Sequence, residues 1–222
     1  MDTVEETLER WCKKDRVSYH VASKLKAKLF PLLEEAHRKL GYRFDKAVIE
    51  HAKGSEVRLY NSAMLVSLLH DKMKPSDFSI EERRMLTLHL EYLPSIEGYL
   101  ASQINFLVFT LIANGHDLYS TRKGDYTKSL KDIEEVNLAF KLKFVREHGF
   151  GRLIANKVDT TLRNSIAHLF YEITEDGTIE IGKKKIPKAQ YVKLYHDIRN
   201  ISFALHYITR LYYTRFATSP AS

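Results

Sequence analysis

The chain has 222 residues, of which 44% are hydrophobic, and a single cysteine, Cys12. That length and apolar content suffice for a globular protein with its own core, and one cysteine excludes an internal disulfide framework and a cysteine-based zinc site. The formal net charge of +7 favours a polyanionic partner, RNA above all, because a cationic surface attracts phosphates and releases their counterions. A basic surface that serves solubility alone is the competing interpretation.

Two stretches bear on where the protein resides. The first nine residues include three glutamates and lack the basic start and apolar centre of a signal peptide. The uncharged stretch 98–115 is near the minimum length of a membrane span, but Gln103 and Asn105 lie in its middle, where unpaired amides in lipid are costly. We therefore expect a helix buried in a protein core, no membrane partner and a cytoplasmic protein.

Helical periodicity dominates the first part of the chain. Apolar residues at spacings of three and four predict a helix over 17–40, which Pro31 bends or splits. A second predicted helix, over 62–73, ends before Pro75, because the residue before a proline disfavours the α region. We interpret residues 1–76 as a helical N-terminal extension.

The second part begins with a capping-box pattern. Ser79 and Glu82 can satisfy free amide groups at the start of a helix that we expect to end near residue 93. Pro94 suits the first turn of the next helix. The core face of that helix repeats at spacings of four, three and four through Leu100, Ile104, Leu107 and Leu111.

A polar loop at 119–125 leads into a predicted helix over 129–147, which Gly149 and Gly151 break. One side of this helix is expected to carry Ile133, Phe140 and Phe144. The next helix, predicted over 152–168, has an apolar stripe and a polar stripe, each with spacings of four. The apolar stripe is Ile154, Val158, Leu162 and Ile166, and the polar stripe is Thr160, Asn164 and His168.

The period changes after residue 168. Two extended stretches flank Asp176 and Gly177, a dipeptide that tolerates the positive backbone angles of a tight turn, so we predict a β-hairpin at about 170–182. It is the only β-structure that we expect. Past Pro187, a final helix has a regular apolar seam, which suits packing within the chain or between chains. The seam comprises Leu194, Ile198, Ile201, Leu205, Ile208 and Tyr212. The predicted fold class is all-α with one short hairpin.

The strongest chemical signal is the hexapeptide Arg163-Asn164-Ser165-Ile166-Ala167-His168. It resembles the R-N-x-x-x-H signature of the HEPN superfamily, whose members are small α-helical domains, many of them metal-independent ribonucleases. The resemblance covers roughly the second half of the chain. It implies a HEPN-like helical bundle over residues 77–222, a homodimer whose motif helices face each other, and RNA products that end in a 2′,3′-cyclic phosphate.

The residue types of the motif suit RNA cleavage without a metal. Histidine can take the proton of a ribose 2′-hydroxyl, which is the role we assign to His168, and the Arg163 guanidinium can offset charge on the phosphate. Asn164 would hold the imidazole or bind phosphate, and the resemblance marks it as a less strict member of the motif. Asp159, four residues before Arg163, is close enough to orient the guanidinium. The competing structural interpretation is a surface ion pair at Arg163 and a helix-capping role for His168.

The helical wheel adds a geometric constraint. On an ideal helix, Arg163 and His168 lie about 140° apart and cannot both point into one small site. Either the helix ends or kinks between them, or a second copy of the chain completes the site. We expect the composite site in a homodimer.

Four lysines at the end of the hairpin are candidates to clamp an RNA backbone: Lys183, Lys184, Lys185 and Lys188. A solvated charged edge that discourages strand pairing is an equal alternative. The tyrosines of the last helix we interpret as core or interface residues rather than base-stacking groups.

The sequence predicts neither a metal site nor a cofactor. It contains no His-Glu-x-x-His pair, no glycine-rich phosphate loop and no serine-nucleophile elbow. The preferred function is a metal-independent endoribonuclease, acting as a toxin or defence effector, with an antitoxin or a nucleotidyltransferase as a further partner. The alternatives are a non-catalytic RNA- or nucleotide-binding dimer and a structural helical protein whose basic surface has no nucleic-acid role.

Overall fold

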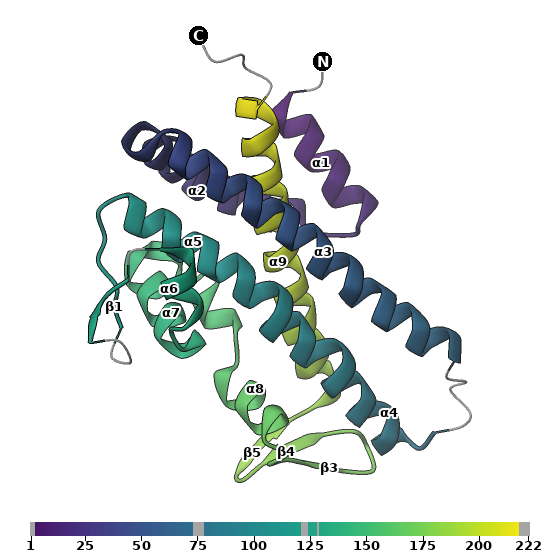
Figure 1. Ribbon diagram of the computed structural model, residues 1–222. Helices are drawn as coiled ribbons and strands as arrows, with labels where there is room; N and C mark the ends of the chain where they lie inside the picture. The colour runs from purple at the N-terminus through teal and green to yellow at the C-terminus, as the bar shows by residue number, and fades with distance from the viewer. Residues whose placement is uncertain (1–2, 73–77, 121–123, 128, 218–222) are drawn as a thin grey trace.

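The computed structural model describes residues 3–72, 78–120, 124–127 and 129–217 (Figure 1). The structure is 75% helical and includes a small three-stranded antiparallel sheet, which agrees with the predicted helical class. Figure 1 shows helix α1 (Val4–Lys14) at one end of the molecule, and helix α8 (Thr160–Ala167) with strands β3 (Glu172–Ile173), β4 (Ile179–Ile181) and β5 (Lys184–Ile186) at the opposite end.

Three helices cover most of the described residues before Pro75, one of them not predicted and one much longer than the periodicity indicated. They are α1 (Val4–Lys14), α2 (Tyr19–Leu40) and α3 (Tyr42–Lys72). Helix α2 runs through Pro31 without a break, so the proline does not split the run. Pro31 is exposed, so the carbonyl that it leaves unpaired four residues earlier can bond to water. The predicted helix over 62–73 is the last part of α3, and its expected end at Pro75 lies outside the described residues.

The two helices predicted on either side of Pro94 form one continuous helix, Ile80–Ala113. The Ser79–Glu82 capping box is present at its start. Along this helix α4 (Ile80–Thr87) passes into two π-helical segments, η2 (Leu88–Tyr92) and η3 (Ser95–Leu100), and then into α5 (Ala101–Ala113). Pro94 sits between the π segments with helical backbone angles, φ −61° and ψ −33°. The wider turns let the helix continue past a residue that has no amide hydrogen, which is why the predicted boundary is wrong.

The same helix is long and apolar enough to cross a membrane by length and composition, but 61% of its most apolar window is buried inside the protein. Its two central amides are paired with protein groups. The Gln103 side chain donates to Ser55 Oγ at 2.9 Å, and Asn105 Oδ1 accepts from Lys141 Nζ at 2.6 Å. These contacts agree with the expectation of a core helix. The predicted core residues Leu100, Ile104, Leu107 and Leu111 are all buried.

The helix predicted over 129–147 is divided. It consists of α6 (Leu130–Glu134), α7 (Leu138–Val145) and a distorted turn, η4 (Arg146–Phe150), which Gly149 kinks with φ +87°. Asn137 caps α7 by accepting the amide hydrogen of Ala139 at 2.8 Å. The break before Asn137 shifts the helical phase, so Phe140 is 51% exposed and its predicted core position is wrong.

Two small sheets are present in the described residues. Strands β1 (Tyr119–Ser120) and β2 (Asp125–Tyr126) pair in the loop that we expected to be irregular. The predicted hairpin is confirmed as β3 (Glu172–Ile173) and β4 (Ile179–Ile181), with Gly177 in the turn at φ +79°. A third strand, β5 (Lys184–Ile186), pairs with β4. Its lysine-rich sequence concealed it, because only Ile186 is buried.

The last helix, α9 (Lys188–Ala217), is the central element of the fold. It packs against α1, α2, α3, α5 and η3, so its apolar seam is used within the chain. Residues from Leu8 to Tyr212 belong to one hydrophobic core. The amide hydrogen of Ser18 also bonds to Asn200 Oδ1 at 2.9 Å. The N-terminal helices therefore pack on the rest of the chain, while the domain boundary near residue 76 stays a prediction.

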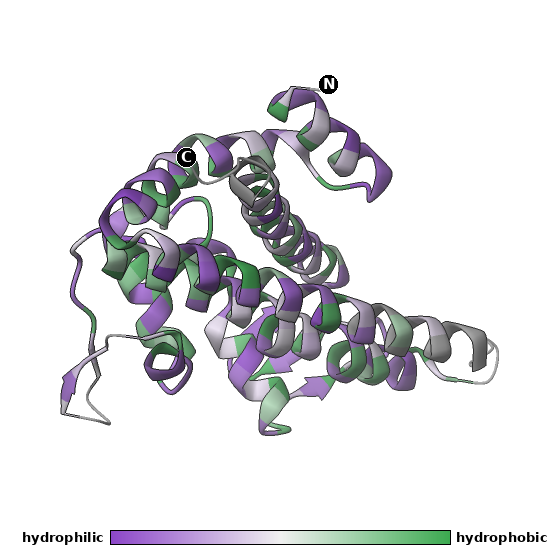
Figure 2. Cartoon of the chain, turned by 45° about the horizontal axis from the view of Figure 1, so that its top comes forward, coloured by the Kyte–Doolittle hydropathy of each residue, from purple (hydrophilic) through white to green (hydrophobic). Residues whose placement is uncertain are grey.

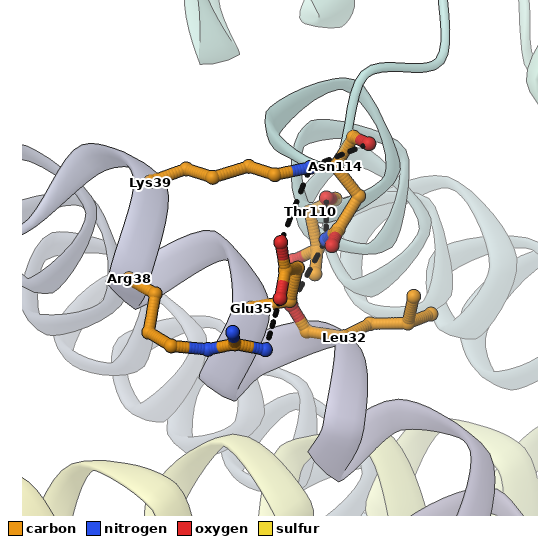
Figure 3. A network of polar contacts seen from close by, with 6 residues as sticks. All are labelled: Leu32, Glu35, Arg38, Lys39, Thr110 and Asn114. Carbon is orange, nitrogen blue, oxygen red and sulfur yellow. Dashed lines mark hydrogen bonds and ion pairs between the residues drawn. The ribbon is translucent and has the colours of Figure 1, made fainter.

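A polar network joins the C-terminal ends of α2 and α5 (Figure 3). Asn114 Nδ2 donates to the carbonyls of Leu32 and Thr110 at 2.9 and 2.8 Å, and Lys39 Nζ donates to the Asn114 carbonyl at 3.0 Å. Glu35 pairs with Lys39 at 3.4 Å. Hydrophobic and hydrophilic residues alternate along the outer helices (Figure 2). The hydrogen bonds of Asn114 and Lys39 fix the relative position of α2 and α5, whose packing is otherwise apolar and non-directional.

Candidate functional site

The motif lies on a helix that is shorter than predicted. After a single 3₁₀ turn, η5 (Ala155–Lys157), the helix α8 covers Thr160–Ala167. The interruption does not expose the apolar stripe, because Ile154, Val158, Leu162 and Ile166 are all buried. On the other side, Asn164 and His168 are exposed. The predicted division between a core face and a polar face is therefore present.

Arg163 points toward the long continuous helix Ile80–Ala113. Its Nε donates to Glu97 Oε1, and one of its terminal nitrogens donates to Asn164 Oδ1 at 2.6 Å. Glu97 lies in the π-helical segment η3, and wide π turns are frequent at functional sites in proteins. The arginine side chain is 23% exposed, so its position is fixed while part of the guanidinium remains accessible.

His168 lies on the opposite edge of α8 and ends the helix. Its backbone is no longer helical, at φ −106° and ψ 7°, and its imidazole is exposed. Helix α8 is unbroken between Arg163 and His168, so no kink brings the two side chains together. Among the described residues, no hydrogen bond joins them. One chain therefore presents the two motif residues in different directions.

The two residues after His168 are apolar and exposed. Leu169 is 67% and Phe170 75% exposed. Leu169 has a left-handed backbone, φ +59°, which is costly for a residue that has a Cβ atom, and it closes α8 in a Schellman motif. The amide hydrogens of Leu169 and Phe170 bond to the carbonyls of Ile166 and Ser165 at 3.2 and 2.8 Å. Directly beyond, the Tyr171 hydroxyl is held to His89 Nε2 at 2.6 Å.

Asp159 does not orient Arg163, contrary to the sequence-based hypothesis. It is the N-cap of α8, where Oδ1 accepts the amide hydrogen of Leu162 at 3.0 Å, and its Oδ2 pairs with Lys184 Nζ at 2.5 Å. A carboxylate that caps a helix is directed along the helix axis, away from a side chain one turn later. Asp159 therefore joins the motif helix to strand β5.

The four lysines of the hairpin region do not form one cluster. Lys184 pairs with Asp159, and Lys185 pairs with Glu180 at 2.6 Å. Lys183 is exposed in the turn between β4 and β5. Lys188 begins α9 and lines a hollow of about 420 Å³. The other residues that line this hollow are Ile80, Arg83, Arg84, Thr87 and Asp176. Lys183 and Lys188 remain the most available of the four for an RNA backbone.

A second, larger cavity begins at Arg163. It has a volume of about 450 Å³ and lies between the long helix and α7, with Arg58 on α3 at its rim. Three cationic residues line it, Arg58, Lys141 and Arg163, together with Glu97 and Glu134. The surplus of positive charge and the volume suit a small anionic ligand.

Lys141 is the most unusual charged residue of the structure. It is 4% exposed, and its ammonium group donates to Asn105 Oδ1 at 2.6 Å and to the Ile133 carbonyl at 3.3 Å. Burial lowers the pKa of Lys141 to about 8, and the negative charges of Glu134 and Glu97 oppose that shift. At neutral pH the group is still mainly protonated.

Sequence reasoning missed Glu97, Arg58 and Lys141. The signal for Lys141 was present, because it lies three residues after Leu138 and four before Val145, on the face that those residues bury. A lysine is almost never fully buried in a protein core unless it has a partner there. Nothing in the sequence pointed to Glu97 beyond its place as the last charge before the uncharged stretch.

The tyrosines of α9 and the acidic and histidine side chains bear on two further questions. Tyr191, Tyr207 and Tyr212 are buried, as expected of core residues. Within the described ranges, no group of three or more histidine, cysteine, aspartate or glutamate side chains could hold a metal ion.

Comparisons with known proteins add no family assignment: no family model, no curated protein and no solved structure matches the chain. The argument for function therefore rests on the residues and their geometry.

Proposed function

We propose that the protein is a metal-independent endoribonuclease of HEPN type that acts as a homodimer. Arg163 of one protomer and His168 of the other form each site, with Asn164 beside the arginine. The observation that carries the proposal is the divergence of Arg163 and His168 on an unbroken α8. A two-fold axis beside the helix brings opposite edges of two copies together, which the single chain cannot do.

The surroundings of His168 support an interface at this place. Leu169 and Phe170 expose adjacent apolar side chains directly after α8, the helix that Figure 1 shows at one end of the molecule. Adjacent exposed apolar residues of this size favour a protein contact, here with a second copy of the chain. The contact of Tyr171 with His89 fixes the segment from the other side. We expect the dimer to bury both apolar residues.

The chemistry follows from the two side chains. The unprotonated imidazole of His168 takes the proton of the ribose 2′-hydroxyl, and the 2′-oxygen attacks the adjacent phosphorus. The bond from phosphorus to the 5′-oxygen of the next nucleotide breaks, which leaves a 2′,3′-cyclic phosphate and, after protonation, a 5′-hydroxyl. The Arg163 guanidinium stabilises the charge that builds on the phosphate oxygens. Asn164 holds the guanidinium in place, since its side-chain oxygen accepts a hydrogen bond from it.

The test is cleavage of mixed cellular RNA in excess chelator by the wild type, Arg163→Ala and His168→Ala. We expect cleavage that leaves cyclic phosphate ends and falls at least about 100-fold in each variant, because one general base or one phosphate-binding cation typically contributes that much. Exposed Lys143, on α7, provides a matched Lys143→Ala control. Cleavage that survives both motif substitutions would rule out the mechanism.

A non-catalytic RNA- or nucleotide-binding dimer is the second candidate. The ion pair between Arg163 and Glu97 favours it over cleavage, because a carboxylate beside the guanidinium opposes the negative charge that builds on the phosphate during the reaction. In that case RNA would bind without being cut, and Arg163→Ala would weaken binding. As a nuclease, the protein would be a cytoplasmic toxin or defence effector with an antitoxin or nucleotidyltransferase partner, and its expression would be better tolerated when Arg163 or His168 is changed.

A further inference from the structure

The cavity beside Arg163 contains a buried cation, Lys141, that forms no ion pair with any of the described carboxylates. Lys141 is almost completely buried, and both of its hydrogen-bond acceptors, Asn105 Oδ1 and the Ile133 carbonyl, are uncharged. Among the described residues, no carboxylate lies within ion-pair distance of the Lys141 ammonium. A buried ammonium without a counterion is strongly unfavourable, so a purely structural lysine would be expected to have an acidic partner.

The ammonium also has capacity for a further contact. It has three N–H donors, of which the two protein acceptors use two. Because Lys141 lines the cavity, a ligand there can accept the third hydrogen. Arg163 and Arg58 line the same cavity from α8 and α3, so cations from three helices converge on it.

We propose that this cavity binds the phosphate group of a nucleotide, with Lys141 as its buried anchor and Arg58 and Arg163 as the flanking cations. The inference goes beyond RNA cleavage and does not require it, because His168 is not among the residues that line the cavity.

Phosphate is the anion that fits these donors best. Its oxygens can accept from the ammonium and from the planar guanidinium groups together, and its charge supplies the counterion that Lys141 lacks. Arg58 bonds to Ser102 Oγ, and Arg163 bonds to Glu97, so both arginines are already directed along the cavity wall. The volume of about 450 Å³ exceeds that of a phosphate ion and leaves room for an attached sugar and base.

Two sources would present this group, a free mononucleotide and the terminal phosphate of an RNA strand. Thermal unfolding of the wild type would be followed with inorganic phosphate and with adenosine 5′-monophosphate, against sodium chloride of equal ionic strength. The RNA arm compares one oligoribonucleotide with and without a 5′-phosphate, in the His168→Ala protein so that the strand stays intact. We expect a rise of about 5 °C or more near saturation with at least one nucleotide carrying a terminal phosphate. A larger rise with the mononucleotide assigns the free ligand, and a larger rise with the phosphorylated strand assigns the RNA end.

Three variants make the result specific. Lys141→Met, which fills the same space without charge, should abolish the stabilisation by the ligand, and Arg58→Gln, on the exposed side of the cavity, should weaken binding about tenfold. Lys143→Met removes an exposed lysine from the same helix and should leave binding unchanged.

Equal stabilisation of the wild type and Lys141→Met by the ligand, or no stabilisation by any phosphate-bearing probe, would overturn the inference. If Lys141→Met does not fold, the comparison of Arg58→Gln with Lys143→Met decides. Phosphate binding in a protein that does not cut RNA would separate this inference from the proposed nuclease.

Discussion

The Arg163 guanidinium is paired with the carboxylate of Glu97, which lies on a different helix, in the π-helical segment η3. The pair connects the motif helix to the long helix and sets the direction of the arginine. It also sets a limit on phosphate binding, because a phosphate must share the guanidinium with the carboxylate or displace it.

Replacing Glu97 by glutamine should therefore strengthen RNA binding. The amide oxygen can still accept a hydrogen bond from Arg163, but it no longer carries the competing charge. We expect the affinity for RNA in low salt to rise about threefold to tenfold, as for the loss of one partly exposed ion pair. Fluorescence anisotropy with a labelled strand in the His168→Ala background measures this. Glu147→Gln is the control, because Glu147 is also an exposed carboxylate that forms an ion pair, in its case with Lys143. Weaker binding in Glu97→Gln would mean that the carboxylate serves to hold the arginine rather than to compete with phosphate.

A composite site has a signature in mixtures of inactive variants. In a heterodimer of Arg163→Ala with His168→Ala, one of the two sites receives an intact arginine and an intact histidine, while the other receives neither. A one-to-one mixture that exchanges subunits freely should recover about one quarter of the wild-type activity, because half of the dimers are mixed and each has one intact site. Cleavage assays after co-refolding of the two variants measure the recovery. If Arg163 and His168 acted within one chain, the mixture would stay inactive.

The role of Asp159 as a helix cap predicts a stability effect. Asp159→Ala loses the bond to the Leu162 amide and should cost about 1 kcal/mol of unfolding free energy, whereas Asp159→Asn keeps a capping oxygen and should cost less. Both variants lose the ion pair with Lys184. Urea unfolding of the two variants separates the contributions. A greater loss in Asp159→Asn than in Asp159→Ala would contradict the capping role.

The sequence predicts the elements of this fold better than their limits. Capping patterns and the Asp176–Gly177 turn are local signals, and the structure contains both the Ser79 cap and the hairpin. Pro94 is normally a boundary, but the packing of the helix on both sides of it outweighs the local preference and is accommodated by π turns. Phe140 was misplaced because the capping residue Asn137 was not recognised as a new helix start.

The candidate site was likewise predictable only where its signals are local in the sequence. The motif itself was visible, since its residues are adjacent in the chain, and its helical spacing predicted that Arg163 and His168 diverge. The contact between Arg163 and Glu97 joins distant parts of the sequence, so no local pattern contains it. The cavity around Lys141 likewise depends on how three helices pack.

Two buried histidines predict that acid destabilises the protein. Burial lowers the pKa of His51 to about 4, and the same effect lowers the pKa of His206 to about 4. The unfolded chain binds these protons near pH 6.5, so between about pH 6.5 and 4 the unfolded state carries more protons than the folded state. Stability is therefore highest above pH 6.5 and falls as the pH drops toward 4, by about 3 kcal/mol for each histidine.

Urea unfolding between pH 7.5 and 4.5 measures this dependence. His51 is held by Gln103 and Ser55, each at 3.2 Å, so His51→Gln keeps a polar side chain and should remove about half of the loss. His196→Gln, which removes an exposed histidine from the same helix as His206, should keep the loss. A stability that stays constant from pH 7.5 to 4.5 in the wild type would show that neither histidine is buried in its neutral form.

Leu169 allows monomer stability and dimer formation to be separated. Its left-handed backbone destabilises the folded state by about 1–2 kcal/mol, a cost that is absent for glycine, although glycine also gives the unfolded chain more freedom. Leu169→Gly should therefore raise the unfolding free energy of the monomer by about 0.5–1 kcal/mol.

The same change removes an exposed apolar side chain beside Phe170, so it should weaken the proposed dimer and lower RNA cleavage. Analytical ultracentrifugation together with urea unfolding of the monomer separates the two effects. The control is Val57→Gly, which removes an exposed apolar side chain from the interior of α3, and should lower stability without changing association. A Leu169→Gly protein with unchanged association and cleavage would place the dimer interface elsewhere, because the exposed pair after His168 would then have no part in it.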